Sequence, residues 1–256
     1  MQVVLLQLNQ SWHSAESNYQ KAEQLLEKEE GIYESLIVFP EMFPSGFSMD
    51  IATVCESAPF PTGNFFSKIA KRYKSYVIGG LAATSPDEPS KGINLSLGYG
   101  PSGERIGCYQ KLQPFSLGGE SEVYEAGAEV VIWDMAGFKV CPLICYDLRF
   151  PEHFRRGIGL GAELFCVIAN WPRKRDIHWR RLLQARAIEN LSYVIGVNRC
   201  GADPSFEYAG RSQVWDPHGD LVADAGNAEC SLVAALERSR LDQWRQDFPA
   251  LRDIRS

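Results

Sequence analysis

A run of short apolar segments that alternate with amphipathic ones limits the fold of this chain more than any other feature. Residues 3–8 are typical of a strand, and residues 14–30 predict a helix with one apolar stripe. The segment "LIVFPE" at residues 36–41 predicts a compact buried strand that its proline ends. A second amphipathic helix at residues 63–74 and a strand at residues 75–84 follow. This order of strands and helices indicates an α/β fold.

The rest of the chain adds hairpins to this pattern. Residues 93–111 predict two strands joined by Pro101-Ser102-Gly103, and residues 129–147 repeat that form around Ala136-Gly137. The later segments predict a helix, a strand, a helix, a strand and a hairpin, at residues 152–157, 163–171, 176–190, 192–201 and 212–226. Because no linker or low-complexity stretch interrupts the chain, we expect one domain over residues 1–256. Its many strands and paired buried runs favour two sheets that face each other, with helices outside them.

The composition excludes several classes of protein. Hydrophobic residues make up 45% of the 256 residues and charged residues 23%, which is ordinary for a globular protein and not for a disordered or fibrous one. The formal net charge is −6, and the basic residues are scattered except in "RKR" at residues 173–175. A phosphate backbone would need a basic face, so we expect no nucleic-acid partner.

The N-terminal residues, the apolar runs and the cysteines indicate the cellular compartment of the protein. The first residues, "MQVVLLQLNQ", carry no basic start and only a short apolar run, so they predict a first strand and not a signal peptide. No apolar run is long enough for a membrane span, so we expect no membrane partner. Seven cysteines are an odd number at irregular spacings, which argues against a disulfide framework and favours the reducing cytoplasm.

Three reactive side chains follow apolar strands directly. Glu41 comes after "LIVFP", Lys111 after "RIGCYQ" and Cys145 after "CPLI". Ligands of α/β sheets gather at the carboxyl ends of strands, so these side chains can meet in one pocket. A carboxylate can take a thiol proton, a lysine can hold an oxyanion and a cysteine can form a thioester. Taken singly, each side chain is better explained by a non-functional role, as a buried thiol for Cys145 and as a solvated charge for Glu41 and Lys111.

The segments around these residues resemble a known family. "FPEMFPSGF", "YQKLQPF" and "ICYDLRFPE" are similar to the three signature blocks of the nitrilase, or carbon–nitrogen hydrolase, superfamily, in that family's order. Later blocks, "ANWP", "LLQARAIEN", "VNRCG" and "YAGRSQVWDPHG", resemble its omega-amidase branch most. The resemblance implies a nitrilase-like four-layer α-β-β-α sandwich. It also implies hydrolysis of short amides such as 2-oxoglutaramate, without a cofactor and in at least a homodimer.

The same resemblance implies roles for individual residues. Glu41 would be the general base, Lys111 the cation of the oxyanion hole and Cys145 the nucleophile. The backbone N–H of Tyr146 would be the second oxyanion donor. The family has a further glutamate between the lysine and the cysteine, which would orient the lysine and the attacking water.

Two glutamates in "GGESEVYEAG" fit that further position, and Glu120 matches the family spacing better than Glu122. We expect Asp147 and Arg149 to pair within the turn after Cys145 and to fix its backbone, because a misplacement of about 1 Å can cost roughly a hundredfold in rate. The alternative for Arg149 is a plain surface charge.

Recognition of a 2-oxoacid amide requires a group that binds the α-carboxylate. The planar fork of arginine suits it, and Arg173, just after "ANWP", is the first candidate, with Trp171 and Phe115 as apolar walls. A solvated loop is an equally good reading of "PRKR". Family members commonly carry a histidine two places after the lysine, where this chain has Gln113. The loop that shapes the specificity end of the pocket therefore departs from the family pattern.

A redox protein and a metal protein are alternatives to a hydrolase. A redox pair of Cys141 and Cys145 would span about 13 Å along a strand, beyond the roughly 7 Å that a disulfide allows between Cα atoms. The histidines form no paired spacing with the cysteines, so we expect no metal site; they are His13, His153, His178 and His218.

A non-catalytic binding module on this fold predicts the loss of a catalytic position, and none of the three is lost. Another small amide or a nitrile remains an alternative substrate. The sequence does not rank 2-oxoglutaramate against 2-oxosuccinamate, glutamine or a longer amide, because one methylene changes discrimination by only about 1–3 kcal/mol.

Overall fold

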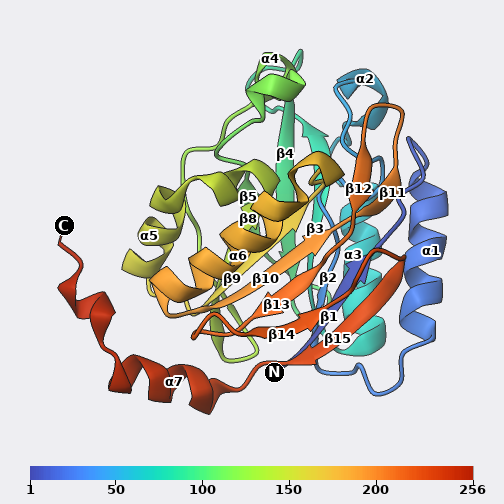
Figure 1. The fold of residues 1–256 in the computed structure, drawn as a ribbon. Coiled ribbons are helices and arrows are strands. Elements are labelled where there is room, and N and C mark those ends of the chain that lie inside the picture. The colour runs from blue at the N-terminus through green and yellow to red at the C-terminus, as the bar shows by residue number, and fades with distance from the viewer. Residues whose placement is uncertain (256) are drawn as a thin grey trace.

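Two β-sheets that face each other form the centre of the protein, as a computed structural model describes it for residues 1–255 (Figure 1). The strand order is β15-β1-β2-β3-β4-β5 in the first sheet, with β6 paired to β4, and β14-β13-β10-β9-β8-β7 in the second. The first sheet consists of β1 (Gln2–Gln7), β2 (Leu36–Val38), β3 (Tyr76–Thr84), β4 (Gly92–Tyr99), β5 (Arg105–Gln110), β6 (Tyr124–Glu125) and β15 (Cys230–Ala235). The second consists of β7 (Trp133–Met135), β8 (Phe138–Ile144), β9 (Leu164–Ala169), β10 (Tyr193–Asn198), β13 (Gln213–Trp215) and β14 (Leu221–Asp224). A separate hairpin pairs β11 (Cys200–Ala202) with β12 (Glu207–Ala209).

Helices cover the outer faces of both sheets (Figure 1). Helices α1 (Ala15–Glu27) and α3 (Pro61–Tyr73) lie on the first sheet, and α5 (Pro151–Gly159) and α6 (Asp176–Asn190) lie on the second. Three further helices are α2 (Ile51–Val54), α4 (Glu120–Val123) and α7 (Arg238–Asp247). The expected four-layer α-β-β-α sandwich is therefore confirmed. The expected single domain over residues 1–256 has its last residue outside the described part.

The alternation of side chains along the strands produces two cores. In β1, Val3 and Leu5 belong to the core between the two sheets, whereas Val4 and Leu6 belong to the core under α1 and α3. Successive side chains of a strand point to opposite faces, so one apolar strand supplies both cores. The apolar run of residues 3–6 within β1 is thus explained by burial on both sides of the sheet.

Most of the predicted helices and strands are present, with differences in the length of one strand and at one edge of the first sheet. The predicted helix at residues 176–190 is α6, and β1, β2 and β3 are parallel neighbours as an α/β unit requires. Strand β2 is shorter than predicted. Strand β15, which no pattern indicated, pairs antiparallel with β1 from Gln2 opposite Ala235 to Gln7 opposite Cys230. Its side chains are half-exposed, so the strand lacks the continuous apolar run of the others.

The two sheets bring four strand ends together. Glu41 follows β2, Lys111 follows β5, Cys145 follows β8 and Asn170 follows β9. The turn that carries Glu41 lies directly on β3, because a Cβ atom added to Gly80 would come within 2.7 Å of the Glu41 Cα atom. Only glycine allows that approach.

None of the helices described for residues 1–255 has the length and apolar character needed to cross a membrane.

Candidate active site

Lys111 lies at the centre of a buried ion-pair cluster. Its Nζ atom is 2.9 Å from Glu41 Oε1 and 2.8 Å from Glu120 Oε2. All three side chains are at most 1% exposed. Cys145 is also buried and lies beside them, since its Sγ atom is 3.9 Å from the carbonyl oxygen of Asn170, whose backbone N–H donates to Glu41 Oε2 at 2.8 Å. The three reactive residues that follow apolar strands in the sequence are thus brought together.

The structure distinguishes between the two candidate glutamates. Glu120 begins α4, is fully buried and also accepts the backbone N–H of Phe115 at 2.6 Å. Glu122 is exposed on the same short helix and makes no contact with Lys111 among the described residues. Of the two glutamates, the one that contacts Lys111 is therefore Glu120.

The turn after β8 holds Cys145 in an unusual backbone conformation. Its φ angle is +48°, in the left-handed region of backbone conformation that residues other than glycine rarely adopt. The buried carboxylate of Asp147 stabilises this turn by accepting the backbone N–H groups of Ile144 and Gln113, both at 2.9 Å, and the hydroxyl of Tyr109 at 2.7 Å. Burial raises the pKa of Asp147 to about 6, against the lowering effect of these hydrogen bonds. Asp147 thus fixes the turn without the expected pairing to an arginine.

The charges of the cluster set the protonation of the thiol. Burial and the negative charge of Glu41 raise the pKa of Cys145 well above its ordinary value, and the positive charge of Lys111 opposes them only in part. Burial disfavours the ammonium of Lys111, but Glu120 and Glu41 together outweigh that effect and raise its pKa. At neutral pH the resting site therefore holds a thiol and an ammonium. Because the thiolate is the nucleophile, a base must take the proton.

Two asparagines that the sequence analysis missed complete the surroundings of Glu41. Asn170 donates its backbone N–H to Glu41 Oε2 at 2.8 Å and its side-chain amide to the Glu41 carbonyl at 2.7 Å. Asn94 donates its side-chain amide to Glu41 Oε1 at 2.8 Å. Asn170 ends an apolar strand just as Cys145 does, so the same pattern could have found it. Asn94 interrupts the apolar strand "INLSL", which is a second usable signal.

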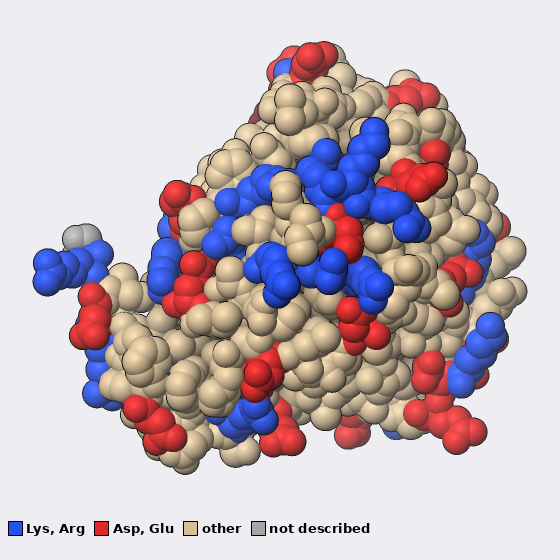
Figure 2. Space-filling model, in the orientation of Figure 1, with Lys and Arg blue, Asp and Glu red and all other residues tan. Residues whose placement is uncertain are grey.

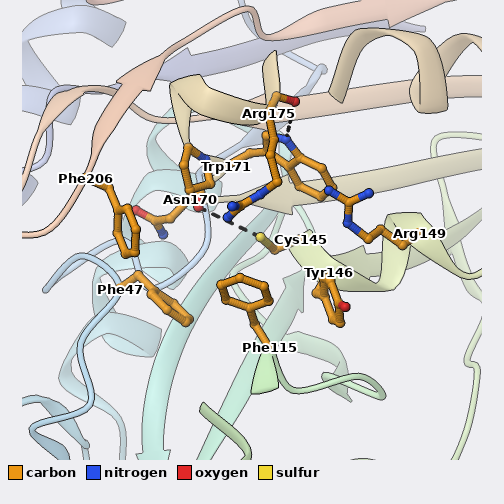
Figure 3. A pocket seen from close by; sticks show the side chains of 10 residues that line it. Phe47, Phe115, Cys145, Tyr146, Arg149, Asn170, Trp171, Arg175 and Phe206 are labelled. Atoms are coloured by element: carbon orange, nitrogen blue, oxygen red, sulfur yellow. Dashed lines mark hydrogen bonds between the residues drawn. The ribbon is translucent and has the colours of Figure 1, made fainter. Parts of the chain in front are cut away.

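Cys145 lines a cavity of about 370 Å³, which includes its open mouth (Figure 3). Phe115 and Trp171, the expected apolar walls, both line it, and so does Tyr146. The remaining lining residues, which the sequence did not single out for this role, are Phe47, Arg149, Asn170, Pro172, Arg175 and Phe206.

Two arginines face this cavity without a carboxylate partner. Arg149 lies over the ring of Trp171, 4.9 Å from its centroid, and Arg175 lies over the ring of Phe115 at 5.1 Å. Within residues 1–255 neither forms an ion pair. Burial and then the charge of Arg175 lower the pKa of Arg149, as expected for two neighbouring cations. The contacts do not include the expected pairing of Arg149 with Asp147, and Arg149 reaches the cavity instead.

Arg173, the expected ligand of a substrate carboxylate, does not line this cavity. Its side chain is 52% exposed, lies in a neighbouring surface hollow and pairs with Glu207 at 3.4 Å. The physical reason is the 3₁₀ turn η3 (Arg173–Arg175), in which positions two apart point in different directions. Arg175 turns inward and Arg173 turns outward, so we replace Arg173 with Arg175 as the candidate.

The described part of the chain holds no group of three or more His, Cys, Asp or Glu side chains arranged to bind a metal ion. The arrangement at Cys145 consists instead of a thiol, two carboxylates and one ammonium. Such a set can perform acyl transfer by covalent catalysis.

Comparisons with known proteins agree with this chemistry. The model of the carbon–nitrogen hydrolase family matches residues 2–246. The chain is 34% identical to omega-amidase YafV of Escherichia coli (strain K12) over 255 residues, 99% of this chain and 96% of that protein. It is 33% identical to 2-oxoglutaramate amidase of Bacillus subtilis (strain 168) over 253 residues, 98% and 96% of the two chains.

A solved structure agrees closely in fold. A CN-hydrolase superfamily protein from Xanthomonas campestris, with an arsenic adduct in its active site, is similar at a TM-score of 0.94 and 32% identity. The similarity covers 100% of this chain and 97% of that one.

Replacement of Asp147 by asparagine tests how the nucleophile turn is held. The carboxamide leaves at least one of three buried donors without an acceptor, so we expect a loss of about 1–3 kcal/mol in the free energy of unfolding at pH 7.5. Because the pKa of Asp147 is raised on folding to about 6, its stabilising contribution is full below about pH 4 and falls as the pH rises through 6. The difference between wild type and Asp147→Asn should therefore be larger at pH 4.5 than at pH 7.5.

Urea unfolding at the two pH values measures both effects. The control is Asp134→Asn, because that side chain is 82% exposed, and its change should stay within about 0.5 kcal/mol at both pH values. Equal and small changes for the two variants would contradict the structural role of Asp147.

Proposed function

Because this chain belongs to the carbon–nitrogen hydrolase family, we propose that it hydrolyses the terminal amide of short 2-oxo dicarboxylic acid monoamides. Substrates of this class are 2-oxoglutaramate and 2-oxosuccinamate, and the products are the 2-oxoacid and ammonia. The relatives named omega-amidase and 2-oxoglutaramate amidase support this class. The observation that carries the proposal is the buried cluster of Glu41, Lys111 and Glu120 beside Cys145, which lines a cavity with two arginines.

Hydrolysis begins with proton transfer from the thiol of Cys145 to the carboxylate of Glu41. The sulfur attacks the amide carbonyl carbon, and Lys111 together with the backbone N–H of Tyr146 stabilises the oxyanion. The carbon–nitrogen bond then breaks as protonated Glu41 gives its proton to the leaving nitrogen, which departs as ammonia. The enzyme is left as a thioester of Cys145 with Glu41 ionised again.

Water completes the cycle. Glu41 takes a proton from a water molecule, whose oxygen attacks the thioester carbonyl, and Glu120 helps to hold this water and Lys111 in place. The carbon–sulfur bond breaks, the sulfur recovers the proton from Glu41, and the 2-oxoacid leaves. One carboxylate thus serves as base and acid in both halves of the reaction.

The hydrogen bonds of Lys111 explain when it becomes available to the oxyanion. At rest it donates to Glu41 Oε1 and to both oxygens of Glu120, so its three N–H groups are engaged. When Glu41 takes the thiol proton it becomes neutral, and its attraction for the ammonium weakens. An N–H of Lys111 is then free to turn to the oxyanion at the moment when the negative charge develops.

Arg175 and Arg149 are the proposed ligands of the α-carboxylate. A guanidinium binds both carboxylate oxygens in its plane, and stacking on Phe115 and Trp171 holds the two cations in place. Among the described lining residues of the cavity, none is acidic. An α-ammonium would therefore lie near two cations without a partner, so the site favours a 2-oxo over a 2-amino acid amide.

The charge around the cavity also suits an anionic substrate. Figure 2 shows Lys and Arg side chains gathered across the middle of one face, over the region of α6 and the β11–β12 hairpin in Figure 1. Residues 173–181 contain five Lys or Arg residues and one acidic residue, Asp176. This local excess opposes the net charge of −6 and attracts anions to the cavity.

A homodimer and a cytoplasmic location belong to the proposal as well. Ile177 and Ile188 of α6 are each 49% exposed, and three turns separate them, so they lie on the same side of the helix. A second copy of the chain would cover these two exposed isoleucines, which Arg181 and Gln184 separate along the helix. The seven cysteines are all free, which suits a reducing compartment.

Variants of the nucleophile and the base test the reaction. Cys145→Ala should abolish ammonia release from 2-oxoglutaramate, and Glu41→Gln should lower kcat by about 10²- to 10⁴-fold, because the thiol then lacks its base. The control is Cys108→Ala, an exposed cysteine, which should stay within about twofold of wild type. Near-parental turnover by Cys145→Ala would refute the proposed reaction.

Two neighbouring arginines provide a matched test of substrate recognition. Arg175→Ala should raise the KM for 2-oxoglutaramate by about 10- to 100-fold, as expected for the loss of charge-assisted hydrogen bonds, and should affect an uncharged amide such as butyramide much less. Arg173→Ala removes the same charge two residues earlier, outside the cavity, and should change KM by less than about threefold. Similar KM values for the two variants would remove Arg175 from carboxylate recognition.

A further inference from the structure

The side chain of Asn94 links the two carboxylates of the buried cluster. Its Nδ2 atom is 2.8 Å from Glu41 Oε1 and 2.9 Å from Glu120 Oε1. Asn94 lies in β4, is 1% exposed and accepts the backbone N–H of Lys111 with its own backbone carbonyl. One side-chain amide has two N–H groups, so each carboxylate can receive one of them.

These contacts form a closed ring of four atoms. Lys111 Nζ lies 2.9 Å from Glu41 Oε1 and 3.0 Å from Glu120 Oε1, which are the two oxygens that Asn94 also contacts. Donors and acceptors alternate around the ring, with a nitrogen between the two oxygens on either side. Each oxygen therefore accepts one hydrogen bond from an ammonium and one from an amide.

The ring bears on the repulsion between the two buried carboxylates of the site. Two buried carboxyl groups face one ammonium, so with both of them ionised the cluster carries one more negative than positive charge. Two carboxylates that share a buried site repel each other, and such a pair usually lowers its energy by binding a proton. A proton bound there would occupy the base that Cys145 needs. A neutral amide that donates to both carboxylates reduces this tendency without a further cation.

We propose that Asn94 is a positioning residue that keeps Glu41 and Glu120 ionised together, so that Glu41 is free to accept the thiol proton of Cys145. This role rests on the proposed function for the identity of the base. Asn94 touches neither the cavity nor Cys145 among the described contacts, so it acts through Glu41. No pattern in the sequence analysis assigned it a function.

A neighbouring residue offers a matched control. Ser96 lies two positions along β4, on the same side of the strand, and is fully buried. Its hydroxyl has no hydrogen-bond partner within residues 1–255, so it is not part of the ring. Ser96→Ala changes a buried polar side chain of the same strand without touching either carboxylate.

The test compares Asn94→Leu, which keeps the approximate shape but removes both donors, with Asn94→Asp, which keeps the shape and adds a third acid. The acidic limb of the pH profile of kcat/KM for 2-oxoglutaramate should move to higher pH by about one unit or more in both variants. The displacement should be larger in Asn94→Asp than in Asn94→Leu. At pH values above the shifted limb, Asn94→Leu should recover most of its activity. Ser96→Ala should keep the wild-type limb.

A second readout separates this proposal from the proposed substrate. Alkylation of Cys145 by iodoacetamide, followed by mass spectrometry, reports the loss of the thiol proton without any amide hydrolysis. Its pH profile should show the same displacement in both Asn94 variants, even if 2-oxoglutaramate proves not to be a substrate. Asn94→Ser, which is smaller and keeps one donor, replaces Asn94→Leu if the latter does not fold, and should show an intermediate displacement.

An unchanged acidic limb in both readouts would overturn the proposal. If Asn94 had a purely structural role, its replacement would lower stability and kcat. The acidic limb of the pH profile would then stay at the same pH as in Ser96→Ala.

Discussion

The buried ammonium of Lys111 lies between two carboxylates, and the geometry of the site depends on that contact. Removal of one partner from a buried ion pair typically costs about 3–5 kcal/mol, because the other charge is left without compensation. Each member of the cluster therefore constrains the other two. Glu41 is held by Lys111, by Asn94 and by the backbone of Asn170, so its carboxylate stays next to the thiol.

The same cluster explains why a buried thiol can still react. In the proposed mechanism, burial and the carboxylates keep the proton on Cys145 until a carbonyl carbon is available, and the transfer of that proton to Glu41 weakens its attraction for Lys111. Deprotonation of the nucleophile and stabilisation of the oxyanion are thereby coupled through one carboxylate. Such coupling favours the transition state over the resting state, which is the requirement for catalysis.

The architecture brings these groups together because their strands end at one edge of the sandwich. Glu41 and Lys111 follow strands of the first sheet, and Cys145 and Asn170 follow strands of the second. The two sheets must therefore face each other for the site to exist. Gly80 on β3 provides the close approach that lets the Glu41 turn rest on its neighbour.

Much of this arrangement was predictable from the sequence. The remainder depends on where individual side chains point, which periodicity does not encode. Apolar strands that end in Glu41, Lys111 and Cys145 indicated the site, and the helical period of residues 176–190 indicated α6. The choice of Arg175 over Arg173 depends on how one 3₁₀ turn is oriented, which residue types do not reveal.

Two further features were missed for related reasons. Asn94 was missed because a single amide within an apolar strand signals a buried polar group without indicating which groups it contacts. Strand β15 was overlooked because it is half-exposed at the sheet edge and carries no continuous apolar signal.

Acid quenching of the enzyme during turnover of 2-oxoglutaramate, followed by peptide mass spectrometry, tests whether the reaction passes through a thioester of Cys145. We expect the peptide containing Cys145 to gain the mass of the 2-oxoacyl group, as a thioester that disappears when the substrate is exhausted. Steady turnover with no acyl group on Cys145, or with the acyl group on another residue, would contradict that expectation.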